Sequence, residues 1–94
     1  MDTRLISIGL GNVANAGKIV AVVAPGSAPA KRLVQDARDS SGSNLIDATA
    51  GRRCRSVMVM DSGQIILSSL LPDTIARRVN GTMDVLGKDD VDEA

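Results

Sequence analysis

Three arginines gather in the short stretch GRRCR, residues 51–55. Arg52, Arg53 and Arg55 repel one another and a turn does not need them, so their clustering favours a binding role. The planar guanidinium group matches phosphate oxygens and the O6/N7 edge of guanine. The alternative is that these charges solvate a surface turn or pair with a carboxylate, such as Asp36 or Asp47, across a subunit contact.

Three further cations lie where they could contact phosphate. Lys18 ends the stretch NVANAGK, which could offer backbone N–H groups and an ammonium to an anion. Lys31 and Arg32 come soon after Ser27, the expected start of a helix, and helix N-termini favour anions. Taken alone, Lys18 is better explained as an ordinary lysine at the start of a strand, and ordinary helix-face charge explains Lys31 and Arg32 equally well.

Gly9, Gly11 and Ala14 have the G-x-G-x-x-A spacing of a dinucleotide-binding turn and follow a strand-like run. Such a turn requires a helix and a crossover of about a dozen residues or more before the next strand. Here only residues 12–17 separate Gly11 from the β-branched run KIVAVVA. We therefore predict a strand-to-strand connection whose glycines adopt positive φ angles, and no nucleotide site.

The composition gives little support to catalysis or metal binding. The chain has no His, and Cys54 is its only cysteine, which excludes the common zinc sites, a Cys–His dyad and an internal disulfide. No spacing of Asp, Arg, Lys and Ser suggests a catalytic constellation. We predict a protein that is not an enzyme, with no catalytic residue, metal ligand, cofactor or small-molecule substrate.

The 94 residues contain no Phe, Tyr or Trp. Proteins that bind single-stranded nucleic acid usually stack bases on aromatic rings, so that class is disfavoured. The core must be built from aliphatic residues and Met, and a small strand-rich domain gains from burying its edges against copies of itself. A homo-oligomer is therefore expected.

The formal net charge of zero hides an asymmetry. Residues 84–94 hold five acidic residues and one Lys, a net charge of −4, so residues 1–83 carry +4. A basic body with an acidic tail is typical of proteins that bind polyanions. We predict one domain over residues 1–82 and a disordered acidic tail over residues 83–94. No stretch has the pattern of a signal peptide or a membrane span, so a soluble cytoplasmic protein is expected.

Hydrophobic periodicity predicts strands and two helices, and hence a small α+β domain. The expected strands are residues 4–8, 18–24, 45–49, 55–60 and 64–70. One helix should follow the N-cap Ser27, and a second should run from Pro72 to Asn80 with Arg77 and Arg78 outward. The strands over 45–49 and 55–60 are expected to form a hairpin with the arginines at its tip.

Several motifs in series resemble the RemA family of extracellular matrix regulatory proteins. They occur in family order from about Leu5 to Val79, and they read IGLGN, SAPAKRLVQDARD, LIDATAGRRCR, VMVMDSGQIILS and PDTIARR. The combination of LIDAT-x-GRR with SAP-x-KR is specific, and the acidic tail lies outside the resemblance.

The resemblance implies a bacterial DNA-binding transcriptional regulator of matrix and biofilm genes, located with the nucleoid. It implies a LytTR-like α+β subunit, antiparallel-rich, that assembles into a ring and contacts duplex DNA through repeated basic loops. By position, Arg52 and Arg53 match the family's paired arginines, and Lys18 matches a basic position after the first loop. With the other basic candidates, the predicted DNA-binding residues are Lys18, Lys31, Arg32, Arg52, Arg53 and Arg55. The main alternative is an oligomeric scaffold whose arginines form intersubunit salt bridges.

Overall fold

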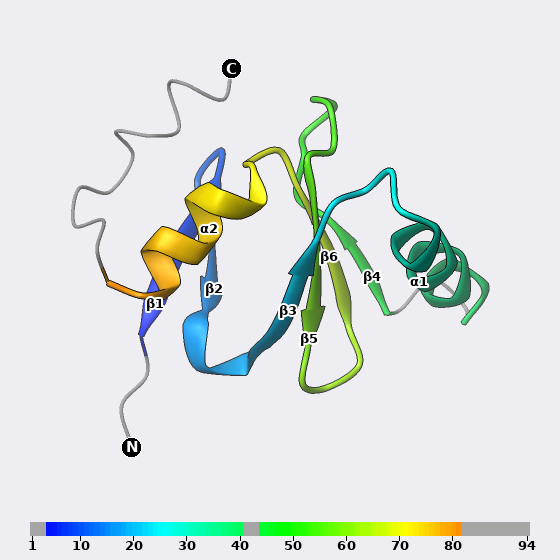
Figure 1. Cartoon of the computed structure of the whole chain (residues 1–94), viewed down its shortest axis with the longest axis horizontal. Coiled ribbons are helices and arrows are strands. Elements are labelled where there is room, and N and C mark those ends of the chain that lie inside the picture. Colours follow the sequence, from blue (N-terminus) through cyan, green and yellow to red (C-terminus); the bar gives the residue numbers. More distant parts are fainter. Residues whose placement is uncertain (1–3, 41–43, 82–94) are drawn as a thin grey trace.

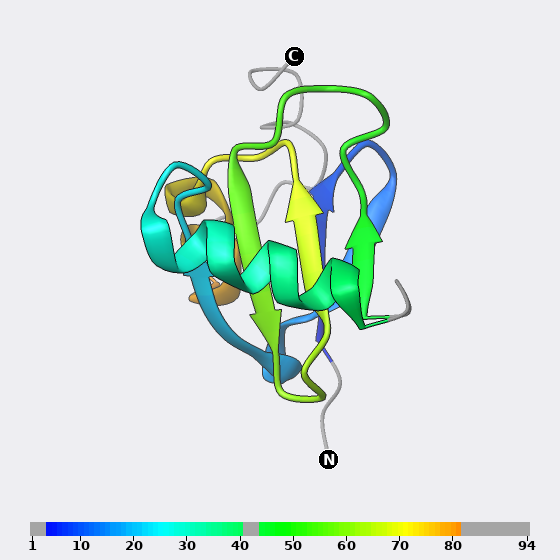
Figure 2. The same ribbon diagram turned by 90° about the vertical axis from the view of Figure 1, so that its right-hand side faces the viewer.

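The computed structural model describes residues 4–40 and 44–81. They form three layers, and the middle layer is a mixed sheet (Figure 1). The middle layer is a four-stranded sheet in the order β3-β5-β6-β4. Helix α1 covers one face, and the hairpin β1–β2 with helix α2 covers the other (Figures 1 and 2). The elements are β1 (Leu5–Gly9), β2 (Asn12–Asn15), β3 (Ile19–Val23), α1 (Ala28–Asp39), β4 (Leu45–Asp47), β5 (Ser56–Met60), β6 (Ile65–Ser68) and α2 (Pro72–Val79). The predicted α+β class with two helices is confirmed.

The glycine-containing stretch forms a β-hairpin and contains no nucleotide-binding helix. β1 pairs antiparallel with β2, and Gly9 and Gly11 at the turn have φ angles of 104° and 82°. The expected glycine turn is therefore confirmed, but β2 is a strand where only a connecting loop was expected. The sequence does not indicate β2, because the strand has only four residues and two of them, Asn12 and Asn15, favour turns. Too few residues remain to show an alternation of apolar and polar side chains.

The predicted hairpin of residues 45–49 and 55–60 is wrong. β4 pairs in parallel with β6, with Leu45 opposite Ile65 and Asp47 opposite Leu67. β5 pairs antiparallel with β6 and with β3, so β6 lies between the two strands that were expected to be partners. Proximity in the sequence favours pairing of β4 with β5, whereas the apolar strand β6, about twenty residues further along the chain, is the actual partner of β4.

Helix α1 begins as predicted. The Ser27 hydroxyl accepts a hydrogen bond from the Ala30 amide at 3.2 Å, and a proline lies in the first turn. Ala30 and Ala37 are buried against the sheet, while Leu33 and Val34 are only half-buried. α1 therefore covers its face of the sheet incompletely.

Helix α2 corrects the expected orientation of Arg78. Its side chain is 3% exposed and donates from Nη1 to the Ser7 carbonyl oxygen on β1 at 2.8 Å. Arg4 donates to the carbonyl oxygens of Arg78 and Val79 at the end of α2, where a cation is favoured. Arg77 is exposed as predicted. The buried Arg78 guanidinium is therefore stabilised by a backbone carbonyl at a position that the sequence pattern assigned to the surface.

Two aliphatic cores fill the spaces between the layers. The first includes Ile6, Met58 and Ile75 and lies between the sheet and the β1–β2/α2 layer, and the second includes Val57 and Leu67 beneath α1. Met58 and Ile75 are fully buried, so Met and Ile do the packing that aromatic rings do in other small domains. Neither described helix is both long and apolar enough to cross a membrane.

Candidate nucleic-acid interface

The arginine-rich stretch lies in the loop of residues 48–55, which joins β4 to β5 across the C-terminal end of β6. The Ala48 amide donates to the Leu67 carbonyl oxygen at 2.9 Å, and the Arg55 amide donates to the Ser68 carbonyl oxygen at 2.8 Å. The two ends of the loop are thus bonded to opposite sides of one strand. A connection that straddles a central strand replaces the expected hairpin tip.

Local hydrogen bonds fix the conformation of this loop. One carboxylate oxygen of Asp47 accepts from the Thr49 hydroxyl at 2.6 Å and from the Thr49 amide at 3.0 Å. The Arg52 amide then donates to the Thr49 carbonyl oxygen at 2.9 Å, which closes a turn with positive φ at Ala50 and Gly51. The Thr49 hydroxyl, the Thr49 amide and, more weakly, the charge of Arg38 lower the pKa of the Asp47 carboxyl.

The β1–β2 turn supports the loop from the neighbouring layer. Asn12 donates from Nδ2 to the Gly9 carbonyl oxygen at 3.2 Å and to the Ala48 carbonyl oxygen at 3.4 Å. The side chain therefore joins the glycine turn to the start of the arginine loop. Sequence reasoning missed Asn12, although an Asn between two glycine-rich turns is a common backbone-bonding residue.

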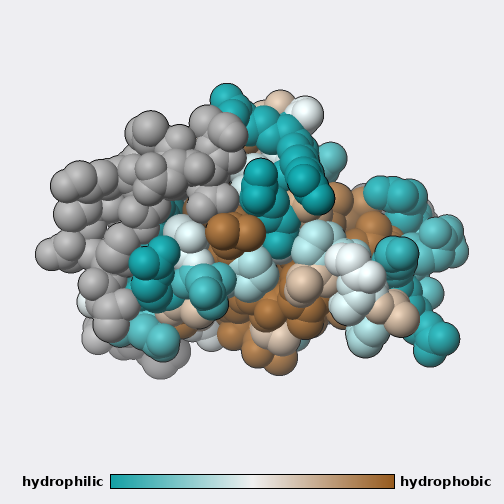
Figure 3. All heavy atoms as spheres, turned by 45° about the horizontal axis from the view of Figure 1, so that its top comes forward, coloured by the Kyte–Doolittle hydropathy of each residue, from teal (hydrophilic) through white to brown (hydrophobic). Residues whose placement is uncertain are grey.

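The loop presents its arginines unequally. Arg52 and Arg53 are exposed, Arg55 is half-buried, and none of the three forms an ion pair with a carboxylate of residues 4–40 and 44–81. Figure 3, with this end turned forward, shows hydrophilic side chains gathered here. The structure thus exposes two arginines that are adjacent in the sequence on a hydrogen-bonded loop.

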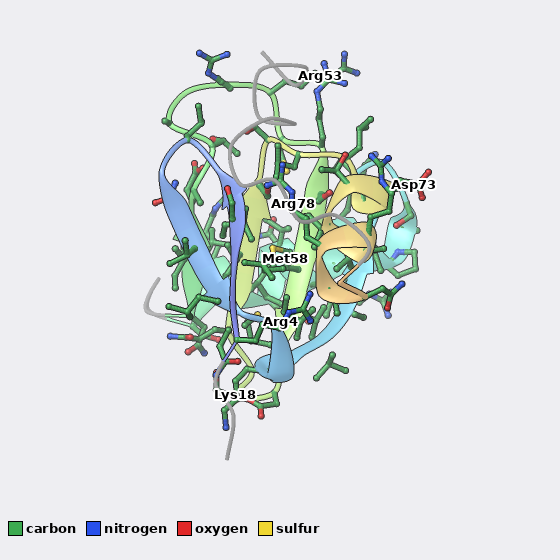
Figure 4. The ribbon with its side chains drawn as sticks, turned by 90° about the vertical axis from the view of Figure 1, so that its left-hand side faces the viewer. Arg4, Lys18, Arg53, Met58, Asp73 and Arg78 are labelled. Carbon is green, nitrogen blue, oxygen red and sulfur yellow. The ribbon has the colours of Figure 1, made fainter. Side chains whose placement is uncertain are left out.

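Lys18 lies at the opposite end of the subunit from Arg53 (Figure 4). It precedes β3, which runs antiparallel to β5, and so it sits beside the β5–β6 turn. Its ammonium lies 3.6 Å from Asp61 Oδ2, and both side chains are about half exposed (60% and 49%). One subunit therefore does not bring Lys18 together with the arginine loop.

Lys31 and Arg32 are both exposed on α1 but face different hollows. Lys31 lines a groove with Cys54 beside the arginine loop, whereas Arg32 lines a hollow with Asp36 on another side of the helix. Only Lys31 extends the basic surface toward the loop. Cys54 is half-buried, its thiol donates to the Ser56 carbonyl oxygen at 3.4 Å, and burial raises the pKa of this thiol.

Residues 5–79 match the family described as RemA-like, extracellular matrix regulatory protein A-like. The chain belongs to the RemA-like family. The match spans every helix and strand given above and confirms the predicted membership. The acidic stretch of residues 84–94 lies outside both the match and the described residues.

Three relatives of this RemA-like chain are each named as a regulatory protein. A protein of Lachnoclostridium phytofermentans is 60% identical over 77 residues, which cover 82% of each chain. One from a Synechococcus strain is 56% identical over 78 residues, or 83% of this chain and 85% of its own. One from Heliobacterium modesticaldum is 48% identical over 93 residues, or 99% and 100% of the two chains. The RemA-like chain is thus a member of a family of regulatory proteins.

Proposed function

We propose that this RemA-like protein is a DNA-binding transcriptional regulator that acts as a ring-shaped homo-oligomer, with Arg52 and Arg53 as its principal DNA contacts. The observation that carries the proposal is the pair of exposed guanidiniums on a loop fixed by Asp47, Thr49 and Asn12. A solvated cation pair without a carboxylate partner among the described residues is suited to a polyanion.

The fixed backbone of the loop favours binding. Ordering a flexible loop on association costs free energy, and a loop that is already hydrogen-bonded avoids most of that cost. Each guanidinium can then bond two phosphate oxygens or the O6/N7 edge of guanine. Arg55 is half-buried at the base of the loop. It contributes to the positive electrostatic potential of the loop more than to direct contacts with DNA.

A few contacts per subunit bind DNA weakly, so repetition around an assembly is required. Linked copies convert each later contact into an intramolecular one at high effective concentration. Lys18 and Arg53 lie at opposite ends of one copy. They can therefore contact the same DNA segment only if the assembly places the Lys18 end of one copy next to the Arg53 end of its neighbour. Most contacts then read backbone and shape, which suits repeated and weakly related sites.

The family description points to extracellular matrix genes as the targets, and DNA binding would place the protein on the nucleoid. No catalytic role is proposed for any residue.

The test replaces Arg52 and Arg53 with Ala and measures duplex-DNA binding by anisotropy at two salt concentrations, with particle mass from light scattering. The matched control is Arg77→Ala, an exposed arginine on α2. Arg52→Ala with Arg53→Ala should weaken binding strongly at unchanged particle mass. The salt slope should fall by about 0.9 for each phosphate that the double variant no longer neutralises.

Three results would reject the proposal or part of it. Unchanged DNA affinity in the double variant would exclude the loop as the principal contact. Dissociation into smaller particles would instead favour the scaffold alternative, in which these arginines pair with carboxylates across subunit contacts. A single subunit that binds its operator as tightly as the assembly would exclude the ring mechanism.

A further inference from the structure

A groove of about 340 Å³ lies between α1 and the sheet, directly beside the arginine loop. Its size falls in the range of small-molecule sites in proteins. Apolar residues (brown) are visible between the loop and α1 in Figure 3. The lining residues are Pro25, Lys31, Val34, Gln35, Arg38, Cys54, Val57 and Leu67.

The floor of the groove is apolar. Val57 and Leu67 are a cross-strand pair on β5 and β6, and they belong to the second core. Val34 on α1 and Cys54 at the end of the arginine loop are only half-buried and form the walls. α1 leaves part of this face of the sheet exposed. The apolar part of a ligand bound here would bury that exposed surface.

The rim of the groove is basic on the side of α1. Lys31, Gln35 and Arg38 are spaced four and then three residues apart, so they share one face of the helix. Among the described residues, no carboxylate lines the groove. The Asp39 carboxylate, one turn further along α1, accepts hydrogen bonds from the side-chain amide of Gln35 at 3.2 and 3.3 Å.

Lys31 and Arg38 form no ion pair with a carboxylate in the part of the chain that the structure describes. Arg38 contributes only the weakest of the effects that lower the pKa of Asp47. Two cations seven residues apart are separated by about 10 Å along the helix axis. The groove thus has an apolar floor and two solvated cations at its mouth.

We propose that this groove is a binding site for a small amphiphilic anion, with an apolar body over Val57 and Leu67 and a carboxylate or phosphate head at Lys31 and Arg38. The protein binds such a ligand without transforming it. Because Cys54 directly follows Arg53, a bound ligand contacts the end of the arginine loop and can change its DNA affinity.

Cys54 provides a direct measurement, since it is the only cysteine of the chain and it lines the groove. Alkylation by iodoacetamide is followed by mass spectrometry at alkaline pH, because burial disfavours the thiolate. Octanoate is the probe and octan-1-ol is its neutral control. At about ten times its Kd, octanoate should slow alkylation about tenfold, whereas octan-1-ol at the same concentration should have little effect.

A pair of matched variants locates the anionic head. Arg38→Gln should raise the Kd for octanoate, measured from the protection of Cys54, by about tenfold, the loss typical of one charge-assisted hydrogen bond. Arg32→Gln removes the same charge from the same helix, but at a position that lines a different hollow, and should leave protection unchanged. Both positions are exposed, so neither change threatens the fold.

Four outcomes would overturn the proposal. Octanoate and octan-1-ol could protect equally, or Arg38→Gln and Arg32→Gln could behave alike, and the groove would then be a nonspecific apolar surface. Alkylation could accelerate on dilution and show no octanoate effect, which would make the groove a contact between copies. Deleting residues 84–94 could expose Cys54 with no octanoate effect, which would make the acidic tail the occupant.

Failure here is distinguishable from failure of the proposed DNA interface. Octanoate protection of Cys54 is read without DNA, whereas the Arg52→Ala, Arg53→Ala double variant is read by DNA affinity alone. If octanoate binds, its effect on DNA affinity is measured afterwards as a coupling between the two sites.

Discussion

Thr49 donates two hydrogen bonds to a single carboxylate oxygen of Asp47, one from its hydroxyl at 2.6 Å and one from its amide at 3.0 Å. This pair stands where β4 ends and the arginine loop begins. It turns the chain toward the end of β6, so that the guanidiniums of Arg52 and Arg53 are presented on a defined backbone rather than on a mobile one.

The Asp47–Thr49 pair should be sensitive to acid. The hydrogen bonds of the Thr49 hydroxyl and amide lower the pKa of the folded carboxyl, so their contribution to stability is present above the unfolded pKa of about 3.9 and is lost as pH falls through the lower folded value. Asp47→Asn should reduce the free energy of unfolding at neutral pH by no more than about 1 kcal/mol, because the site is exposed.

Urea unfolding followed by far-UV circular dichroism measures this difference at neutral pH and near pH 3. The difference between wild type and Asp47→Asn should shrink at the lower pH. Asp36→Asn on α1 serves as the control. A difference that persists unchanged in acid would mean that the charge of Asp47 does not stabilise the turn.

The fully buried Met58 should be the most sensitive position of the first core. Its exposed fraction is 0%, and it packs between the β1–β2/α2 layer and the sheet. Met58→Ala should lower the free energy of unfolding by about 2–5 kcal/mol, through reduced burial and the cavity left behind. Leu33→Ala, at a half-buried position on α1, should cost about 1 kcal/mol. Equal losses in urea titrations would contradict the difference in packing between the two layers.

The two turn glycines should differ in their tolerance of Ala. A Cβ on Gly9 would meet Leu70 Cγ at 3.2 Å and Ser69 Oγ at 3.3 Å, in addition to the strain of φ at 104°. A Cβ on Gly11 would meet no atom within 4 Å, and only the positive φ remains unfavourable. We expect a loss of about 2–3 kcal/mol for Gly9→Ala and about 1 kcal/mol for Gly11→Ala by thermal unfolding. A larger loss for Gly11→Ala would refute the steric argument.

Lys18 should matter for DNA and hardly for stability. Its exposed pair with Asp61 is worth less than about 1 kcal/mol, so Lys18→Gln and Asp61→Asn should unfold close to wild type. If Lys18 contacts phosphate in the proposed assembly, Lys18→Gln should lower the salt slope of DNA binding by about 1 for each phosphate that Lys18 neutralises, and Lys18→Arg should restore it. A Lys18→Gln slope equal to that of wild type would remove Lys18 from the proposed interface.

The acidic tail should oppose DNA binding at low salt. Residues 84–94 carry a net charge of −4, and we expect them to compete with phosphate for the basic loop through long-range attraction. Deleting these residues should tighten DNA binding at low ionic strength and have little effect at high ionic strength, where charges are screened. Anisotropy titrations that give one affinity for both chains at low salt would exclude this competition.

The local elements of this protein could be predicted from its residues. The Ser27 cap, the apolar runs of β5 and β6 and the positive φ of Gly9 and Gly11 depend on neighbours within a few residues, so periodicity and turn chemistry identified them. The motifs around GRR and SAPAKR likewise identified the family.

The pairing of the strands and the placement of the cations could not be predicted in this way. β4 pairs with β6 rather than with β5, because a sheet is assembled from apolar surfaces that are distant along the chain. Tertiary packing also places Lys18 and Arg53 at opposite ends of the subunit, and a backbone carbonyl on β1 holds Arg78 inside it. Periodicity reports which face of an element is apolar, but only packing fixes what that face meets.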